Sequence, residues 1–453
     1  MPAVLGSESD QPVAAAPVAG PAPRSVSLNA RQSLAYGLLG LPLAFVSLPL
    51  YVLLPHHYAR EFGLPLATLG ALLLAARLAD ALIDPFLGRW IDRCFRRSAR
   101  SVQRLGLLAA LLLALGLTGL FLPPLRAANA LLLWAGAALL LTYAAYSLLA
   151  IAHQAWGARL GGDEVERGRI VAWREGAGLF GVVLASVLPA WQGIGAMLAV
   201  FAISLALGCL AWWHSPLPHA PHAPHAPQGV VDPGRVPVSF WQPWRQPAFR
   251  GLLGVFVLNG IATAIPATLV LFFIEDRLQA PAAQQPLFLL TYFLAAALGL
   301  PLWLRLVRIW GLARSWLLGM GLSVAVFSWA AALGAGDLIP FGLVCLLAGL
   351  ALGADLALPS ALLAGLLAES GQRDQHAATY FGWWNFATKL NLALAAGLAL
   401  PLLAWWGYEP GSRSAQGLLA LSWAYAVLPC VLKLLAAAAL WRWSRLHHPW
   451  SSR

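Results

Sequence analysis

Three ionisable residues lie close together inside one apolar run of the sequence. Arg77, Asp80 and Asp84 fall at spacings of three and four, so a helix places them on one face. Two carboxylates one turn apart repel each other when both are ionised, and a shared proton or a small bound cation relieves that repulsion. We therefore predict a cation-coupling site at Asp80 and Asp84, with Arg77 as the balancing charge. The alternative is a purely structural cluster that pins helices together.

Asp355, Lys389 and Lys433 also fall within apolar runs. An ionisable group at mid-bilayer costs about 2.5–3.5 kcal/mol on insertion scales, so each of them needs a partner or a function. Lys389 lies about ten residues into its run, near the midplane, and we expect it to line a transport path. We expect Lys433 to be structural, with its amine reaching toward water. Asp355 either lines the path or pairs with one of the two lysines.

The sequence offers no constellation for catalysis or for a resident metal. The four cysteines, at 94, 209, 345 and 430, have no metal-ligand spacing, and we expect small buried hydrophobes. His56 and His57 are adjacent, and neighbouring side chains on a helix diverge by about 100°. We predict no catalytic residue, no metal site and no cofactor, the coupling ion H⁺ or Na⁺ apart.

Long apolar runs must position these residues. The chain has 453 residues, of which 60% are hydrophobic and 10% charged, against about a quarter charged in soluble domains. Runs of about 18 or more apolar residues predict membrane-spanning helices, whereas the two-residue alternation of a β-barrel is absent. The expected spans are 34–54, 66–90, 105–122, 130–155, 171–190, 193–212, 249–273, 285–304, 314–334, 338–367, 380–404 and 417–440.

Charge in the loops predicts the orientation. The formal net charge is +11, but Lys and Arg concentrate in alternate loops, which sets membrane topology and needs no nucleic-acid partner. With the N-terminus inside, the cytoplasmic segments hold 22 Lys and Arg and the opposite side holds 4. We therefore expect a multi-pass protein of a bacterial inner membrane with both termini in the cytoplasm.

The spans divide into two sets of six. We expect a disordered N-terminal tail over 1–33, a first six-helix half over 34–212, and a Pro- and His-rich cytoplasmic linker over 213–248. A second half over 249–441 and a cytoplasmic tail over 442–453 follow. Glycine and proline interrupt some spans, for example at Gly37, Gly40, Pro42 and Pro49, as is typical of two-halved transporters.

Four stretches resemble one transporter family, the glycoside–pentoside–hexuronide:cation symporters of the major facilitator superfamily. They are Arg77-Leu78-Ala79-Asp80-Ala81-Leu82-Ile83-Asp84-Pro85-Phe86-Leu87-Gly88, Glu166-Arg167 with Arg174, Tyr380-Phe381-Gly382-Trp383 with Lys389, and Gly407-Tyr408-Glu409-Pro410. The resemblance covers nearly the whole chain after residue 33. It implies a cation site at Asp80 and Asp84, with substrate near Arg174 and Lys389. It also suggests Ser147 as a hydroxyl ligand for sodium, although an ordinary packing serine is equally compatible.

Some positions depart from the melibiose permeases. Leu43 and Ala44 stand where those carry a Lys-Asp pair, and Ala150 replaces an acid that grips the sugar. Loss of such polar groups disfavours a galactoside. His153, one turn from Ala150, either lines the path or is a buried histidine bonded to a neighbouring helix. Ile83 replaces the Asn of sodium-using relatives, so we favour H⁺ over Na⁺.

A cytoplasmic gate is expected after the second span. Asp92 and Arg93 stand where related loops lock the inward gate through ion pairs, and Arg174 or Glu175 are candidate partners.

The predicted fold is an all-α major facilitator fold of twelve helices that works by alternating access on a small solute, as a monomer in the lipid bilayer. A carrier of an amphiphile such as a lysolipid or fatty acid derivative is the first alternative. A non-transporting membrane scaffold or enzyme is the second.

Overall fold

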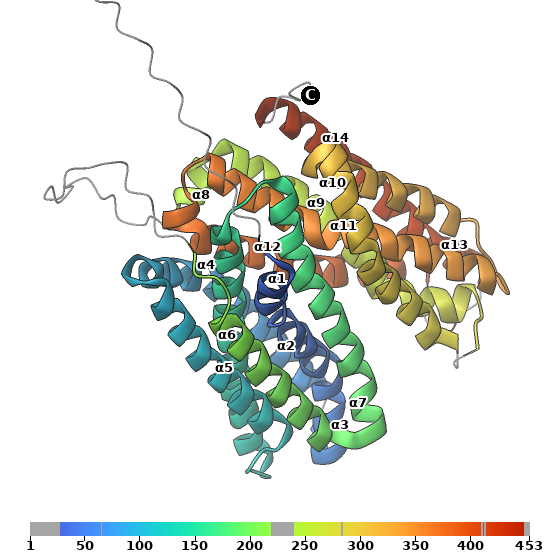
Figure 1. Cartoon of the computed structure of the whole chain (residues 1–453). Coiled ribbons are helices and arrows are strands. Elements are labelled where there is room, and N and C mark those ends of the chain that lie inside the picture. Colours follow the sequence, from blue (N-terminus) through green and yellow to red (C-terminus); the bar gives the residue numbers. More distant parts are fainter. Residues whose placement is uncertain are drawn as a thin grey trace, which may run out of the picture.

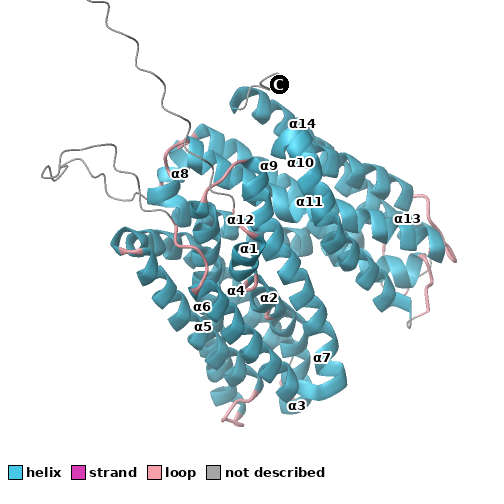
Figure 2. Cartoon of the chain, in the orientation of Figure 1, coloured by secondary structure: helices cyan, strands magenta, loops and turns pink. Residues whose placement is uncertain are grey.

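The computed structural model describes residues 28–64, 66–218, 240–281, 284–408, 411 and 414–447. Figure 2 shows that helices make up this part of the chain, joined by short loops, and the described residues contain no strand. The helices are α1 (Ala30–Gly37), α2 (Gly40–Phe45), η1 (Pro49–Leu53), α3 (Leu54–Phe62), α4 (Leu66–Arg97), α5 (Ala99–Phe121), α6 (Ala128–Leu160), α7 (Glu164–Trp213), α8 (Gln242–Arg245), α9 (Pro247–Phe272), η2 (Phe273–Arg277), α10 (Gln285–Ala330), α11 (Leu338–Glu369), α12 (Arg373–Trp405), α13 (Ala415–Ser422), η4 (Trp423–Val427) and α14 (Leu428–His447).

These helices form the expected spans. Eight helical segments of the described part are long and apolar enough to cross a membrane. Two of them come from α7, whose backbone turns at Gly193 (φ 80°). A third, α10, turns in the same way at Gly311 (φ 77°) and contains two spans. The segments 30–62, 66–97 and 373–405 complete the set of twelve within the described residues.

The first span is broken where glycine and proline predict it. α1 ends at Gly37, α2 begins at Gly40, and a π-helical turn starts at Pro49. The two glycines let this span pack closely on α7, since a Cβ on Gly37 would lie 2.8 Å from the Trp173 backbone and one on Gly40 would lie 2.3 Å from the Arg174 carbonyl oxygen.

The segment boundaries differ in detail from the prediction. α1 begins at Ala30, capped by the Asn29 side chain, so the last part of the expected N-terminal tail is helical. Within the expected linker, α8 covers Gln242–Arg245 and α9 already begins at Pro247. α14 continues to His447, past the predicted end of the second half. Residues 1–27 of the expected tail and 219–239 of the expected linker lie outside the described residues.

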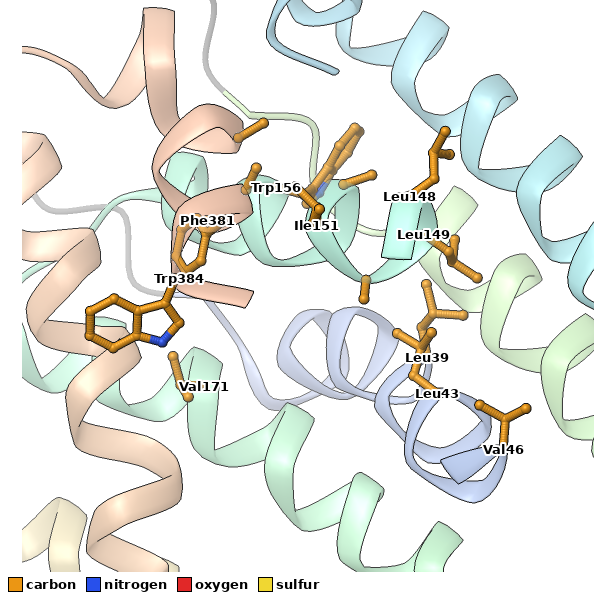
Figure 3. Packing of buried hydrophobic residues seen from close by; sticks show 14 of the residues in the cluster. Leu39, Leu43, Val46, Leu148, Leu149, Ile151, Trp156, Val171, Phe381 and Trp384 are labelled. Atoms are coloured by element: carbon orange, nitrogen blue, oxygen red, sulfur yellow. The ribbon is translucent and has the colours of Figure 1, made fainter. Parts of the chain in front are cut away.

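The two halves contact each other mainly through α4 with α12 and through α7 with α10 and α11. Figure 1 shows the halves close together on the side where α8 lies and α14 ends, and diverging toward the side of α3 and α13. A buried apolar cluster extends through the first half and continues into the second. Figure 3 shows part of it, where Leu39, directly before α2, lies toward Leu149 of α6, with Leu43 of α2 beside it. Leu43 therefore serves as a core residue in this protein.

Candidate functional site

Two glycines bring α4 and α12 into backbone contact. A Cβ on Gly88 would lie 2.2 Å from the Ala378 carbonyl oxygen, and one on Gly382 would lie 2.6 Å from the Asp84 carbonyl oxygen. No larger residue fits at either position without separating the helices. Gly382 lies two turns before Lys389 on α12, so this contact also brings the lysine to the acidic face of α4.

Lys389 contacts both carboxylates of α4. Its Nζ lies 2.6 Å from Asp80 Oδ2 and 2.9 Å from Asp84 Oδ1. The side chains of Asp80 and Asp84 are 3% and 0% exposed, whereas that of Lys389 is 18% exposed. Two negative charges therefore share one ammonium group. Of these three charged side chains, that of Lys389 is partly exposed and the two carboxylates are buried. The acids belong to the first half and the lysine to the second, so this ion pair connects the halves.

Ser147 of α6 completes the cluster. Its hydroxyl donates to Asp80 Oδ1 at 2.8 Å and accepts from Lys389 Nζ at 2.7 Å. The structure thus brings together Asp80, Asp84, Ser147 and Lys389, and the resemblance alone had suggested the serine. Arg77 lies about two turns before Asp84 and is partly exposed, while the balancing charge in contact with the acids is Lys389.

Asp355 and Lys433 form a second polar cluster inside the C-terminal half. Lys433 Nζ lies 2.6 Å from Asp355 Oδ2 and also donates to Asn259 Oδ1 at 2.9 Å and to Thr263 Oγ1 at 3.1 Å. Trp316 Nε1 donates to Asp355 Oδ1 at 2.9 Å. The expectation that Lys433 extends toward water is wrong, because its residue is only 3% exposed and α14 continues for 14 residues beyond it. Asp355 pairs with Lys433, one of its two expected partners.

His153 is a buried histidine held by the first span. Its Nε2 lies 2.8 Å from the Tyr36 carbonyl oxygen, and since a carbonyl can only accept, Nε2 carries the proton. The Tyr36 ring lies against the imidazole, with ring centroids 4.3 Å apart. The residue is 0% exposed. Of the two readings of the sequence, this geometry fits the histidine bonded to a neighbouring helix.

Asp92, near the end of α4, connects this helix to α12. Its partners are not Arg174 or Glu175, which the sequence had suggested. Its Oδ2 accepts bonds at 2.7 Å from both the backbone N–H and the hydroxyl of Thr379, and its Oδ1 accepts from the Ala378 N–H at 3.0 Å and from Arg159 at 2.9 Å. The carboxylate thus binds α12 near its start through two backbone N–H groups and one hydroxyl, and connects the two halves there.

The expected gate partners lie elsewhere. Arg174 binds its neighbour Glu175 at 2.5 Å and is buried against the first span. Arg93 is exposed. A second contact across the halves comes from Glu164, whose carboxylate accepts the Leu312 N–H at 3.0 Å, directly after the Gly311 turn. The sequence reasoning missed Arg159, Glu164 and Thr379, since nothing local to these residues indicates which distant residue each of them contacts.

In the part of the chain that the structure describes, no group of three or more His, Cys, Asp or Glu side chains could hold a metal ion. The chemistry on offer is therefore that of two buried carboxylates, one hydroxyl and one movable ammonium at the contact between two helical halves.

Twelve spans in two halves, with charged residues at their contact, define a membrane transporter of the major facilitator fold. The chain belongs to the MFS/sugar transport protein family, whose model matches residues 33–445. This membership indicates a transporter and not an enzyme.

Solved structures support the fold. The chain is similar to a bacterial homologue of the iron transporter ferroportin in an outward-facing state, with 16% identity, a TM-score of 0.66, and coverage of 92% of this chain and 100% of that one. It is also similar to the E. coli fucose:proton symporter (15% identity, TM-score 0.62, 89% and 98% covered). A human organic anion transporter gives 19% identity and a TM-score of 0.60, with 90% and 99% covered. At such identities these likenesses concern the fold alone.

Proposed function

We propose that this secondary transporter couples the movement of a small solute to a cation that exchanges with the Lys389 ammonium at Asp80 and Asp84. The observation that carries the proposal is the contact of one lysine with both carboxylates across the two halves. An ammonium, a proton and a sodium ion all relieve the repulsion between the two acids, so the site accepts any one of them.

The exchange would link cation binding to alternating access. While Lys389 holds Asp80 and Asp84, it connects α12 of the second half to α4 of the first. A cation that enters the site takes over the neutralising role and frees the ammonium. The loss of that connection favours separation of α4 and α12. The equilibrium then shifts toward the state that is open on the side closed in this structure. A ligand shifts such an equilibrium only by its differential affinity for the two states, and competition with Lys389 supplies that difference.

We place the proton ahead of sodium. Sodium requires several oxygen ligands, and Ile83 contributes none where sodium-using relatives of the resembled family have Asn. The oxygens near the site come from Asp80, Asp84 and Ser147. We further propose that the protein acts as a monomer in a bacterial inner membrane with both termini in the cytoplasm, so that the side closed here is the cytoplasmic one.

The test is transport into proteoliposomes under imposed pH and sodium gradients, with a screen of solutes. We expect a pH gradient to drive uptake in the native protein and Asp80→Asn or Asp84→Asn to abolish that dependence. Asp337→Asn is the matched control, because Asp337 lies at the start of α11 and bonds only locally, to the Gly334 N–H. If uptake by both Asp80→Asn and Asp84→Asn still depended on the gradient as in the native protein, Asp80 and Asp84 would not be the coupling site.

A second candidate function is the transport of an amphiphile. One observation favours it: a largely apolar cavity of about 120 Å³ lies within the C-terminal half. A melting temperature that rises with lysolipids and not with sugars would support this candidate over a polar solute.

A further inference from the structure

The cavity in the C-terminal half is distinct from the contact between the halves. It is lined by α9, α10, α11, η4 and α14, all of the second half. Its volume of about 120 Å³ is below the range of about 300–1,000 Å³ that whole small-molecule sites occupy, so the cavity encloses part of a ligand and leaves the rest to extend through its mouth. The coupling cluster of α4, α6 and α12 contributes no lining residue, so the cavity is a separate site.

Aromatic and aliphatic side chains form most of the cavity wall. Phe288, Phe293 and Phe327 contribute rings, and Val344 and Leu352 contribute aliphatic surface. Such a wall favours an apolar ligand body, which gains free energy by leaving water.

One end of the cavity is polar but carries no net charge. Asp355 and Lys433 both line it, and each of the three N–H groups of the ammonium already has an acceptor in Asp355, Asn259 or Thr263. A ligand with a net charge would find its counter-ion already paired, and binding it would leave one buried charge in excess.

Three hydroxyl groups on the wall remain available. Tyr292, Tyr425 and Ser323 all line the cavity, and among the described residues none of their side-chain oxygens has a hydrogen-bond partner. Hydroxyl groups without protein partners call for oxygen acceptors and donors on a ligand. The residues lining the mouth are apolar, since Ala267 is exposed and Val270 and Leu289 are partly exposed.

We propose that this cavity binds a net-neutral, single-chain amphiphile. Its oxygen-rich polar end lies toward Asp355, Lys433 and the three hydroxyls, and its apolar chain leaves between α9 and α10. The site is independent of the cation exchange proposed at Asp80 and Asp84, and either proposal stands if the other fails.

The experiment uses the full-length protein in lipid nanodiscs with a photoreactive 1-decanoylglycerol analogue, and mass spectrometry maps the labelled peptides. We expect labels on the lining residues of α9, α10 and α11. Unlabelled 1-decanoylglycerol should compete, whereas decanoate, decyltrimethylammonium and glycerol should not. Equal competition by the charged chains would overturn the neutral polar end, and competition by glycerol would overturn the need for a chain.

Two variants test the location. Ala267→Trp fills the mouth from an exposed position and should reduce labelling by about tenfold, whereas Leu271→Trp, on the same helix and 48% exposed but not part of the lining, should leave it unchanged. Tyr292→Phe removes one hydroxyl and should weaken competition by 1-decanoylglycerol by roughly fivefold. Full labelling in Ala267→Trp would overturn the site, and Asp84→Asn should label like the native protein.

Discussion

At the scale of single residues, the main feature is that a lysine takes the place of an external cation. Asp80 and Asp84 are almost completely buried, so without a positive partner both could not stay ionised. Lys389 provides that partner from the other half of the molecule, and its partial exposure leaves it able to exchange. The sequence indicated that the two acids need a positive charge, whereas the structure shows which residue supplies one.

Replacing Lys389 should reveal the identity of the coupling ion. Lys389→Met leaves two facing carboxylates with no ammonium between them, so a variant with an empty site is destabilised by about 3–5 kcal/mol. Binding one proton or one sodium ion relieves the repulsion, so the melting temperature should rise as pH falls, or with NaCl but not with choline chloride. Native protein measured in the same buffers is the control. A melting temperature that responds to neither pH nor sodium would contradict a site for a visiting cation.

Asp355 and Lys433 give a prediction about stability. Lys433→Met alone leaves a buried carboxylate that has lost its counter-ion, and should cost about 3–5 kcal/mol. The double variant Asp355→Leu with Lys433→Met removes both charges and should regain most of that loss, in line with other buried ion pairs. Melting temperatures of the single and double variants, measured in one detergent, check this. A double variant less stable than Lys433→Met would show that Lys433 is not the main counter-ion of Asp355.

Much of the coupling site could be predicted from the sequence, but its pairing could not. Asp80 lies three residues after Arg77 and Asp84 four residues after Asp80, so their shared face follows from helix geometry. Lys389 is 305 residues away from Asp84, and no local pattern states which helices meet. For the same reason the sequence indicated Arg77, the nearest base in the chain, and did not identify Lys389 as a partner of both acids.

At the scale of helices, glycine determines how closely α4 and α12 approach. Gly88 and Gly382 stand where each helix meets the backbone of the other. The resemblance included both glycines as parts of motifs, and the structure supplies a physical reason for them. Their contact also sets the distance between Lys389 and the acids.

Gly88→Ala should separate these helices. The added Cβ would lie 2.2 Å from the Ala378 carbonyl oxygen, so α12 must move or the closed side must open. Overpacking of this kind costs roughly 1–3 kcal/mol. We expect a lower melting temperature and faster alkylation of a cysteine placed at Thr379 in a background without Cys94. Gly70→Ala is the control on the same helix, because nothing lies within 4 Å of its added Cβ. Equal behaviour of the two variants would contradict the role of Gly88.

Apolar runs predicted the membrane spans well but the helix ends less well. The second span was expected over 66–90, whereas α4 continues to Arg97. The run of apolar residues reports where the bilayer ends, but a helix can continue into water when its residues favour helix and its end is solvated. Lys433 was expected to reach water for a different reason: the sequence does not show that Asp355, Asn259 and Thr263 of other helices surround its amine.

At the scale of the whole molecule, the halves are joined on one side and diverge on the other (Figure 1). Asp92 with Thr379, and Glu164 with Leu312, hold the joined side together. These links would have to break for the protein to open there. The fold class and the two-halved plan were predictable from the spans and the linker, but the conformational state was not, because it depends on contacts between distant helices.

Cysteine labelling should establish the orientation of this arrangement. Leu125 and Leu217 are exposed residues at opposite ends of the spans. In a Cys94→Ala background, an impermeant maleimide should label Leu125→Cys in intact cells and Leu217→Cys only after the membrane is disrupted. The other three cysteines are buried and should stay unlabelled. The reverse pattern would contradict the orientation that the loop charges predict.

The turns at Gly193 and Gly311 contain no extra residues that could absorb a change in chain length. Each reverses the backbone with a single glycine of positive φ, inside what is otherwise one continuous helical segment. A one-residue insertion beside either glycine cannot be absorbed, and would rotate the following span by about 100° so that its lipid-facing side turns inward. Length changes that a loop would tolerate should therefore be harmful at these two positions.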